Sequence, residues 1–369
     1  MLDQRVRFNN FQAEPAELRA RELAAVQEVI ASGWWVLGNQ VKQFEAEWSK
    51  RCQVDGAVGV ASGLDALEIG LRTLGIGAGD EVITTSVTAF ATILAIQRVG
   101  AIPVFAEIDL QTACLDVNSV ARCISQNTKA VLVVHLYGRA ADVEALADLC
   151  ASHQLLLLED CAQAHLAAVQ GRPVGSFGAF GAWSFYPTKN LGAIGDAGAI
   201  TSQSRDLLDQ AAKIRNYGQT DRYHHEIEGQ NSRLDELQAA ILLVRLQDLE
   251  QWTQRRREIA MAYWHGIHNP ALELLMQPQD PASHVHHLFV LRTKERARFQ
   301  HAMADSGIDT LIHYPVPSHL QQALRGHRLD PEGLPNTVQH CDQCCSLPVH
   351  PGLADAEVQR VIEACNAWS

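Results

Sequence analysis

The sequence predicts an α/β fold, with a mostly parallel central sheet flanked by helices and a smaller C-terminal α+β domain. One observation is the alternation of short apolar runs with helical patterns between residues 57 and 200. Strand, helix and strand in succession imply parallel pairing, because the crossover returns the chain to the same end of the sheet. The second observation is the composition, with 47% hydrophobic and 20% charged residues in a chain of 369. Such a chain buries a full core instead of staying disordered.

Short apolar runs mark the expected buried strands. These runs are Ala57–Val60, Val82–Thr85, Pro103–Phe105, Ala130–Val134 and Leu155–Leu158. Between the last two, apolar residues recur at i, i+3, i+4 and i+7 from Val143 onward, which predicts a helix over Asp142–Cys150. The glycine-rich run Gly75–Gly79 precedes a strand, whereas a dinucleotide-binding loop follows one, so we interpret it as a turn.

The second half of the chain predicts a change of domain near Glu250. A strong helical pattern runs from Arg233 to Val244, and the basic run Arg255–Arg257 after it is interpreted as the solvated face of an extended helix. A strand is expected at Leu288–Arg292. The predicted parts are a large domain over residues 1–250, with an N-terminal helical segment at about 1–30, and a small domain over residues 251–369.

Charge and cysteine usage exclude several classes of function. The net charge of −12 argues against nucleic acid and anionic membranes as partners. No stretch approaches the roughly 20 apolar residues that span a bilayer, and the first residues lack the apolar core of a signal peptide, so we expect a cytoplasmic protein. Nine scattered cysteines indicate reduced thiols.

No metal site is expected. The lone CxxC at Cys341–Cys344 has no second pair, and the histidine clusters are interpreted as surface or pocket residues, so we assign no metal.

Lys189 is the first candidate for chemistry. It follows a proline in the apolar stretch Ser184–Gly192, and burial would lower its pKa and make it a nucleophile toward carbonyls. Taken alone, an ordinary loop lysine is the better interpretation. Asp160 changes that balance, because it follows a buried strand and would meet a ligand at the strand's carboxyl end. Pyridoxal phosphate needs such a carboxylate at its ring nitrogen, and Gln163 could bond the ring hydroxyl. A helix N-cap is the alternative role for Asp160.

A phosphate site is predicted at Ser62 and Gly63, which follow the strand at 57–60 and open a helix. Helix amino ends bind phosphate through free N–H groups and the helix dipole, and Ser62 adds a hydroxyl. By itself this pattern is everyday helix capping. Ser184, shortly before Lys189, is a second hydroxyl donor expected near the same phosphate.

These motifs together resemble the DegT/DnrJ/EryC1/StrS family of sugar aminotransferases, which has the aspartate-aminotransferase fold, fold type I of the pyridoxal-phosphate-dependent transferases. The similar stretches cover nearly the whole chain. They are Gly33–Gly38, Ser62–Leu67, Gly100–Phe105, Glu159–His165, Ser184–Lys189, Asn231–Ala240, His313–Pro315 and Ser346–Pro348.

The resemblance implies a role for each matching residue. Lys189 would form the Schiff base with pyridoxal 5'-phosphate, Asp160 would pair with the pyridinium nitrogen and Gln163 would contact the ring hydroxyl. Phosphate binding would fall to Ser62, Gly63, the backbone of Leu64, and Ser184. Asn231 matches a residue that reaches the phosphate of the neighbouring subunit, which implies an obligate homodimer with shared active sites. Substrate contacts would come from Tyr186, Tyr217, His313 and Tyr314.

Two positions depart from the family pattern. Leu64 stands where the family has threonine, so a hydroxyl toward the phosphate is lost. Ala89 stands where an aromatic ring usually covers the cofactor, and Phe90, one residue later, is the candidate that takes its place.

The resemblance also implies the reaction. An amino group would pass from L-glutamate, with pyridoxamine 5'-phosphate as intermediate, to a nucleotide-linked keto sugar. The stretches Asn216–Gly229 and His313–Pro317 resemble members that aminate C3 of a dTDP-3-keto-6-deoxyhexose. The alternatives are a C4 aminotransferase of a 4-keto sugar and a non-catalytic, pyridoxal-phosphate-binding regulator. Lys189 argues against the dehydratases of the family, which carry histidine there.

Overall fold

An eight-stranded sheet forms the centre of the computed structural model, which describes residues 5–324 and 326–369. In spatial order its strands are β1 (Gly56–Val60), β9 (Gly198–Ser202), β8 (Gly181–Ser184), β5 (Leu156–Asp160), β4 (Thr128–Val134), β2 (Glu81–Thr85), β3 (Ile102–Ala106) and β14 (Arg328–Leu329). Among these strands only β9 runs antiparallel to its neighbours. The prediction of a mostly parallel sheet is confirmed, and the expected strands all form.

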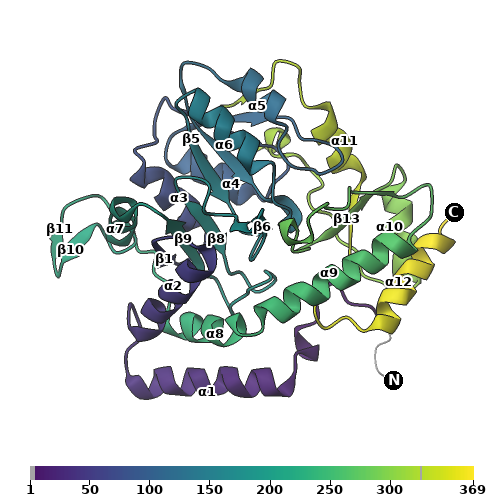
Figure 1. Cartoon of the computed structure of the whole chain (residues 1–369), viewed down its shortest axis with the longest axis horizontal. Helices are drawn as coiled ribbons and strands as arrows, with labels where there is room; N and C mark the ends of the chain where they lie inside the picture. Colours follow the sequence, from purple (N-terminus) through teal and green to yellow (C-terminus); the bar gives the residue numbers. More distant parts are fainter. Residues whose placement is uncertain (1–4, 325) are drawn as a thin grey trace.

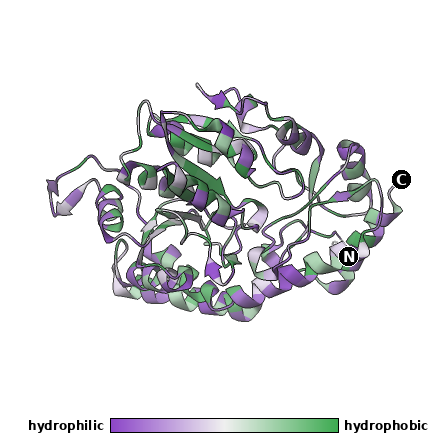
Figure 2. Cartoon of the chain, turned by 45° about the horizontal axis from the view of Figure 1, so that its top comes forward, coloured by the Kyte–Doolittle hydropathy of each residue, from purple (hydrophilic) through white to green (hydrophobic). Residues whose placement is uncertain are grey.

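Helices flank this sheet (Figure 1). They are α2 (Asn39–Cys52), α3 (Gly63–Thr73), α4 (Phe90–Arg98), α5 (Val117–Cys123), α6 (Val143–Ser152), α7 (Arg205–Ile214) and α8 (Glu236–Leu246). Figure 2 shows the hydrophobic strands inside and hydrophilic residues along the outer helices. Among the described residues, no helix is long and apolar enough to cross a membrane.

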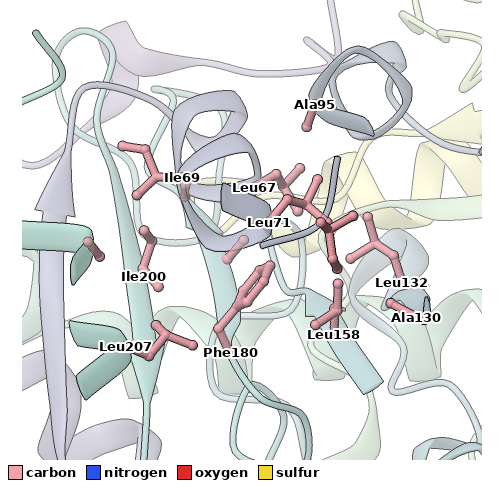
Figure 3. Close-up of a cluster of buried hydrophobic side chains, with 14 of the residues drawn as sticks. Leu67, Ile69, Leu71, Ala95, Ala130, Leu132, Leu158, Phe180, Ile200 and Leu207 are labelled. Atoms are coloured by element: carbon pink, nitrogen blue, oxygen red, sulfur yellow. The ribbon is translucent and has the colours of Figure 1, made fainter. Parts of the chain in front are cut away.

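One face of the sheet is closed by α3. Leu67 and Leu71 of this helix belong to the same buried cluster as Leu158 of β5 and Phe180, which lies just before β8 (Figure 3). Gly70 leaves room for the Phe180 ring, since a Cβ at this position would lie 2.5 Å from it. Each fully buried side chain of this size contributes about 1.5–3 kcal/mol, so this packing fixes the start of α3 against the ends of the strands.

The opposite cluster is aromatic. Trp48 of α2 packs edge-on against Trp183 of β8, with ring centroids 4.9 Å apart, and against Phe185 at 5.5 Å. Leu191 and Ala193 belong to the same cluster. The turn that carries Lys189 is therefore held on a packed layer and not on a free loop.

The remaining elements lie outside the large sheet. They are α1 (Ala16–Ser32), η1 (Phe11–Ala13), η2 (Leu136–Gly138), η3 (Pro281–Ser283), η4 (Ser318–Leu320), the pair β6 (Ala168–Val169) and β7 (Arg172–Pro173), and the hairpin β10 (Gln219–Asp221) and β11 (His224–His225). The hairpin projects from the body of the molecule (Figure 1). The N-terminal helix is shifted from the predicted segment 1–30, of which residues 1–4 lie outside the described part.

The long helix α9 (Leu249–Gly266) leads to the C-terminal part, where a three-stranded antiparallel sheet packs against helices (Figure 1). Its elements are β12 (Glu273–Leu274), β13 (Phe289–Arg292), β15 (Cys344–Leu347), α10 (Arg296–Asp305), α11 (Pro335–Gln343) and α12 (Asp355–Ala367). The core of this part also includes Val6, whereas β14 joins the large sheet beside β3. The division of the chain at residue 250 stays a prediction.

The prediction that Arg255–Arg257 is a solvated helix face is wrong for Arg256. This side chain is 5% exposed and donates to the carbonyl oxygens of Val349 at 2.5 Å and His286 at 3.2 Å. Burial lowers the pKa of Arg256 to about 10. Backbone carbonyls replace the carboxylate that a buried guanidinium usually needs, and such a partner leaves no trace in a charge pattern. The side chains of His284, His286 and His287 are also buried, so these three residues do not lie on the surface. All nine cysteines are buried and form no disulfide.

Candidate active site

The predicted phosphate residues meet at the ends of β1, β9 and β8. Strand register places both Val60 and Ser184 opposite Gly198, so the turn after β1 lies beside the end of β8. Ser62 caps α3, accepting a hydrogen bond from the Asp65 N–H at 3.1 Å. Gly63 lies directly against Ser184, whose Cβ would be 2.6 Å from a Cβ at Gly63. A helix amino end and two serine hydroxyls therefore converge at one point, as a phosphate requires.

Leu64 is partly buried, and its side chain packs against the core cluster beneath α3. Its backbone N–H remains in the first turn of that helix, where such groups lack a partner within the helix. Compared with the threonine that the resemblance implies, Leu64 lacks a hydroxyl but keeps the backbone donor. Phosphate binding by this N–H stays a prediction.

Asp160 ends β5 and is buried. Its Oδ1 accepts from the Ala162 N–H at 3.1 Å and its Oδ2 from the Thr92 hydroxyl at 2.8 Å. Because a carboxylate can only accept, Thr92 donates to it, and the Thr88 hydroxyl 2.8 Å away must donate to Thr92. Burial raises the pKa of Asp160 above its usual range, while these donors and the positive charge of Lys189 oppose that shift. The hydrogen bonds from Thr88 to Thr92 and from Thr92 to Asp160 orient the carboxylate and favour its ionised form.

Lys189 lies in a turn after β8, where its N–H donates to the Tyr186 carbonyl at 2.8 Å. Burial lowers the pKa of the Lys189 amine to about 8, against the opposing pull of the Asp160 carboxylate. An amine with this pKa is partly neutral near physiological pH and can act as a nucleophile and a base. Burial, with the Lys189 charge adding to it, lowers the pKa of His165 to about 3 and of His313 to about 4, so both rings near this amine are neutral.

The amide of Gln163 has a defined orientation. Its Oε1 accepts from the Tyr137 N–H at 2.6 Å, and its Nε2 donates to the Tyr314 hydroxyl at 3.2 Å. The NH₂ group therefore faces the side where Tyr314 lies. A ring hydroxyl bound there would receive a hydrogen bond, in keeping with the predicted contact of Gln163.

His313 and Tyr314 reach the site from the C-terminal part of the chain. The His313 Nδ1 lies 2.9 Å from the hydroxyl of Ser346 on β15. Burial raises the pKa of Tyr314 to about 12, opposed by its bond with Gln163. The structure thus brings both residues beside Lys189 and Gln163, although their contacts with a substrate stay a prediction.

Four further predicted residues are exposed or only partly buried in the single chain. Tyr186 is 51% exposed and Tyr217 is 45% exposed, the latter beneath the Arg233 guanidinium at 5.3 Å. Asn231 is exposed, although Ser232 beside it is buried. Phe90 begins α4 and packs against the small cluster around Ile93, Phe105 and Leu334. The cofactor or substrate contacts of these four residues stay predictions.

His135, Glu159 and Cys161 form a buried group whose ligand atoms lie within 4.8 Å of one another. The Glu159 carboxylate already accepts N–H bonds from Gly175 at 2.7 Å and Gly178 at 2.7 Å, and lies 3.0 Å from His135 Nε2. His135 Nδ1 accepts from a backbone N–H at 3.2 Å, so Nε2 carries the proton. The protein itself satisfies the Glu159 carboxylate and the His135 ring, and these two residues hold the turn after β7 against β5.

The donor set fits pyridoxal phosphate. A helix amino end with two hydroxyls suits the phosphate, a buried and hydrogen-bonded carboxylate suits a ring nitrogen, and an amine with a lowered pKa suits a carbonyl carbon. All three lie at the carboxyl ends of parallel strands, where ligands of such sheets bind. Fold and site together define a fold type I pyridoxal-phosphate-dependent transferase.

The comparison with known families completes the assignment. The model of the DegT/DnrJ/EryC1/StrS aminotransferase family matches residues 16–366, and the chain belongs to this family. It is therefore an aminotransferase, as the resemblance implied.

Relatives and solved structures match over nearly the full length. The dTDP-3-amino-3,4,6-trideoxy-alpha-D-glucose transaminase of Streptomyces venezuelae is 44% identical over 99% of this chain and 96% of its own length. The dTDP-3-amino-3,6-dideoxy-alpha-D-galactopyranose transaminase of Aneurinibacillus thermoaerophilus is 45% identical over 93% of this chain and 94% of its own. The crystal structure of DesV from S. venezuelae, in complex with a ketimine intermediate, has a TM-score of 0.95 and 43% identity, covering 99% and 98% of the two chains.

Proposed function

We propose that the protein transfers an amino group from L-glutamate to C3 of a dTDP-linked 3-keto-6-deoxyhexose. The observation that carries this proposal is the intact set of Lys189, Asp160 and Gln163 at the sheet edge, with His313 and Tyr314 beside it. Support for the sugar comes from two relatives, each above 40% identity, whose names describe transaminases of dTDP-linked 3-amino sugars.

The residues of this chain divide the work. When bound, pyridoxal phosphate supplies an electron sink for the negative charge left at a carbon that loses a proton. Lys189 Nζ, with its lowered pKa, would accept that proton from the carbon of the amino donor and deliver it to the cofactor carbon that bears the nitrogen. In the second half-reaction it would move a proton in the opposite direction, to the sugar carbon. Asp160 would hold the ring nitrogen, and Gln163 the ring hydroxyl. Ser62 at the start of α3 and Ser184 at the end of β8 would hold the phosphate, so that the same geometry serves both half-reactions.

The experiment that tests the substrate is a panel of nucleotide-linked keto sugars with glutamate as donor. We expect the 3-keto-6-deoxyhexose to accept the amino group, with the new amine located at C3 by NMR of the product. Amination at C4 of a 4-keto sugar would replace this proposal with the first alternative. Binding of the cofactor without any transamination would favour the regulator instead.

We further propose an obligate homodimer in a cytoplasmic location. Exposed apolar side chains lie close to the start of α8. There the Trp35 carbonyl accepts from the Glu236 N–H, and the Ile194 N–H donates to the side-chain oxygen of Gln238. Asn231, also exposed, follows the projecting hairpin and precedes α8. A second copy that covers this face would bury the apolar groups and receive Asn231 at its phosphate site.

Mixing two defective variants tests the shared site. Lys189→Ala and Asn231→Ala protomers each carry a different defect, so a hybrid dimer contains one site with both wild-type residues. We expect activity to rise after the two variants are dissociated, mixed and reassociated, as measured by 2-oxoglutarate release. If each site belonged to a single chain, mixing would add nothing to the activity of Asn231→Ala alone.

A further inference from the structure

Tyr137 contacts both Gln163, which is expected to bind the cofactor, and His313, which is expected to bind the substrate. It has no role in the function proposed above. It lies in η2, directly after β4, and is buried. Its backbone φ is +60°, in the left-handed region that residues other than glycine rarely adopt. At Gly138 beside it, with φ +90°, a Cβ would lie 2.9 Å from both the Gln163 carbonyl and the His287 nitrogen. Such unusual backbone at a site is a starting point for a functional hypothesis.

The backbone of Tyr137 serves the cofactor side. The conformation of η2 aims its N–H at Gln163 Oε1, 2.6 Å away. This donor decides which end of the Gln163 amide faces the site, because an amide oxygen accepts and an amide nitrogen donates. Gln163 Nε2 is left to donate toward Tyr314.

The side chain of Tyr137 serves the substrate side. Its hydroxyl bonds with the backbone carbonyl of His313 and lies 2.8 Å from His340 Nε2. Since a carbonyl can only accept, the Tyr137 hydroxyl donates to His313 and must accept from His340. Burial lowers the pKa of His340 to about 3, so this ring is neutral and carries its single proton on Nε2. The Tyr137 hydroxyl therefore donates one hydrogen bond, to His313, and accepts one, from His340.

Three polar partners outside the CxxC segment hold His313 and Tyr314. Tyr137 holds the backbone of His313, Ser346 lies 2.9 Å from its ring, and Gln163 donates to Tyr314. Among these partners Tyr137 is the one whose backbone and side chain reach both the cofactor-side amide and the substrate-side segment.

We propose that Tyr137 is a positioning residue that sets His313 and Tyr314 for the keto sugar, through its hydroxyl, while its N–H orients Gln163. This inference rests on the proposed function, in which those two residues contact the substrate. The hydroxyl acts on the second half-reaction, in which the keto sugar binds, and the N–H acts equally in both.

The test uses Tyr137→Phe in the full-length holoenzyme, because this change removes the hydroxyl and leaves the N–H in place. We expect KM for the keto sugar to rise about tenfold, equivalent to ~1.4 kcal/mol. The rate of the glutamate half-reaction should change at least several-fold less, since Gln163 keeps its donor.

Tyr263→Phe is the matched control. Tyr263 is also fully buried, and its hydroxyl also donates to a backbone carbonyl, that of Pro348 at 2.7 Å. Both variants lose a buried hydrogen bond, so both should unfold at lower temperature. Only Tyr137→Phe should raise KM. An unchanged KM in Tyr137→Phe, or an equal rise in both variants, would overturn the proposal.

A second readout separates this proposal from the proposed function. Burial lowers the pKa of His313 to about 4. In Tyr137→Phe, NMR titration should find the pKa of His313 shifted upward, because the released segment gains access to water, while Tyr263→Phe should leave it unchanged. If the wild-type protein aminated none of the sugars, the proposed function would fail, yet this titration would still decide the role of Tyr137. An unchanged pKa in Tyr137→Phe would refute it.

Discussion

Lys189→Ala should eliminate amino transfer, with a loss of turnover on the order of 10⁴-fold or more, as expected when a group that acts in every covalent and proton-transfer step is removed. The physical reason is that Lys189 is the amine at this edge of the sheet whose pKa burial brings to about 8. At neutral pH part of it is unprotonated and can attack a carbonyl carbon. Neutral His165 and His313, with pKa values near 3 and 4, are far weaker bases.

Folding and chemistry can be separated for this variant. Burial disfavours the charged amine, so removing Lys189 should not lower the melting temperature. Lys189→Arg is the matched control, because it keeps a cation beside Asp160 but offers no neutral nucleophile. Both variants should lack the visible absorbance band of the lysine-bound cofactor and the glutamate half-reaction. Full turnover by either one would show that Lys189 is not the reacting amine.

Asp160→Asn should lower kcat by about 10²–10³-fold, the usual cost of losing one preorganised electrostatic contact in an active site. The carboxylate is the group that can keep a ring nitrogen protonated, and an amide cannot. The variant should still fold, because the Asn oxygen can accept from the Ala162 N–H and its NH₂ can donate to Thr92. The Thr92 and Thr88 hydroxyls can then reverse their direction.

Two measurements check this prediction. The pH dependence of the cofactor's absorption should shift in Asp160→Asn, because the ring nitrogen loses its anionic partner. Asp160→Glu, which keeps the charge but misplaces it, should recover part of that spectral shift. Wild-type kcat in Asp160→Asn would contradict the pairing of Asp160 with the ring nitrogen.

Much of the site was predictable because its chemistry is tied to local pattern. Asp160 follows an apolar run that can only be a buried strand, and Ser62 follows another at the start of a helix. Because β9 runs antiparallel to both β1 and β8, and β8 runs parallel to β5, β1 and β5 point the same way and their carboxyl ends lie at the same side of the sheet. Lys189 could be predicted as the reactive amine only because of Asp160 and Ser62, since the sequence of its own loop does not distinguish it from a surface lysine.

The parts that could not be predicted depend on tertiary contacts. Thr92 of α4 reaches Asp160 from 68 positions away in the chain, and Tyr137 reaches His313 from 176 positions away. Neither contact alters the hydrophobic period of its own segment, so no local pattern indicates it. The prediction of a solvated helix face is wrong for Arg256 for the same reason, since carbonyl partners leave no charge pattern. The pairing of β14 with β3 joins segments too short and distant for a strand pattern to reveal.

The glutamate half-reaction of the purified wild-type protein is the most direct measurement of the role of Lys189. With glutamate alone, the visible absorbance of the lysine-bound cofactor should disappear as one equivalent of 2-oxoglutarate forms per site. Subsequent addition of a dTDP-linked 3-keto-6-deoxyhexose should restore the absorbance and yield the 3-amino sugar. A protein that binds the cofactor but leaves glutamate unconverted, with its absorbance unchanged, would contradict the assignment of Lys189 as the reacting amine.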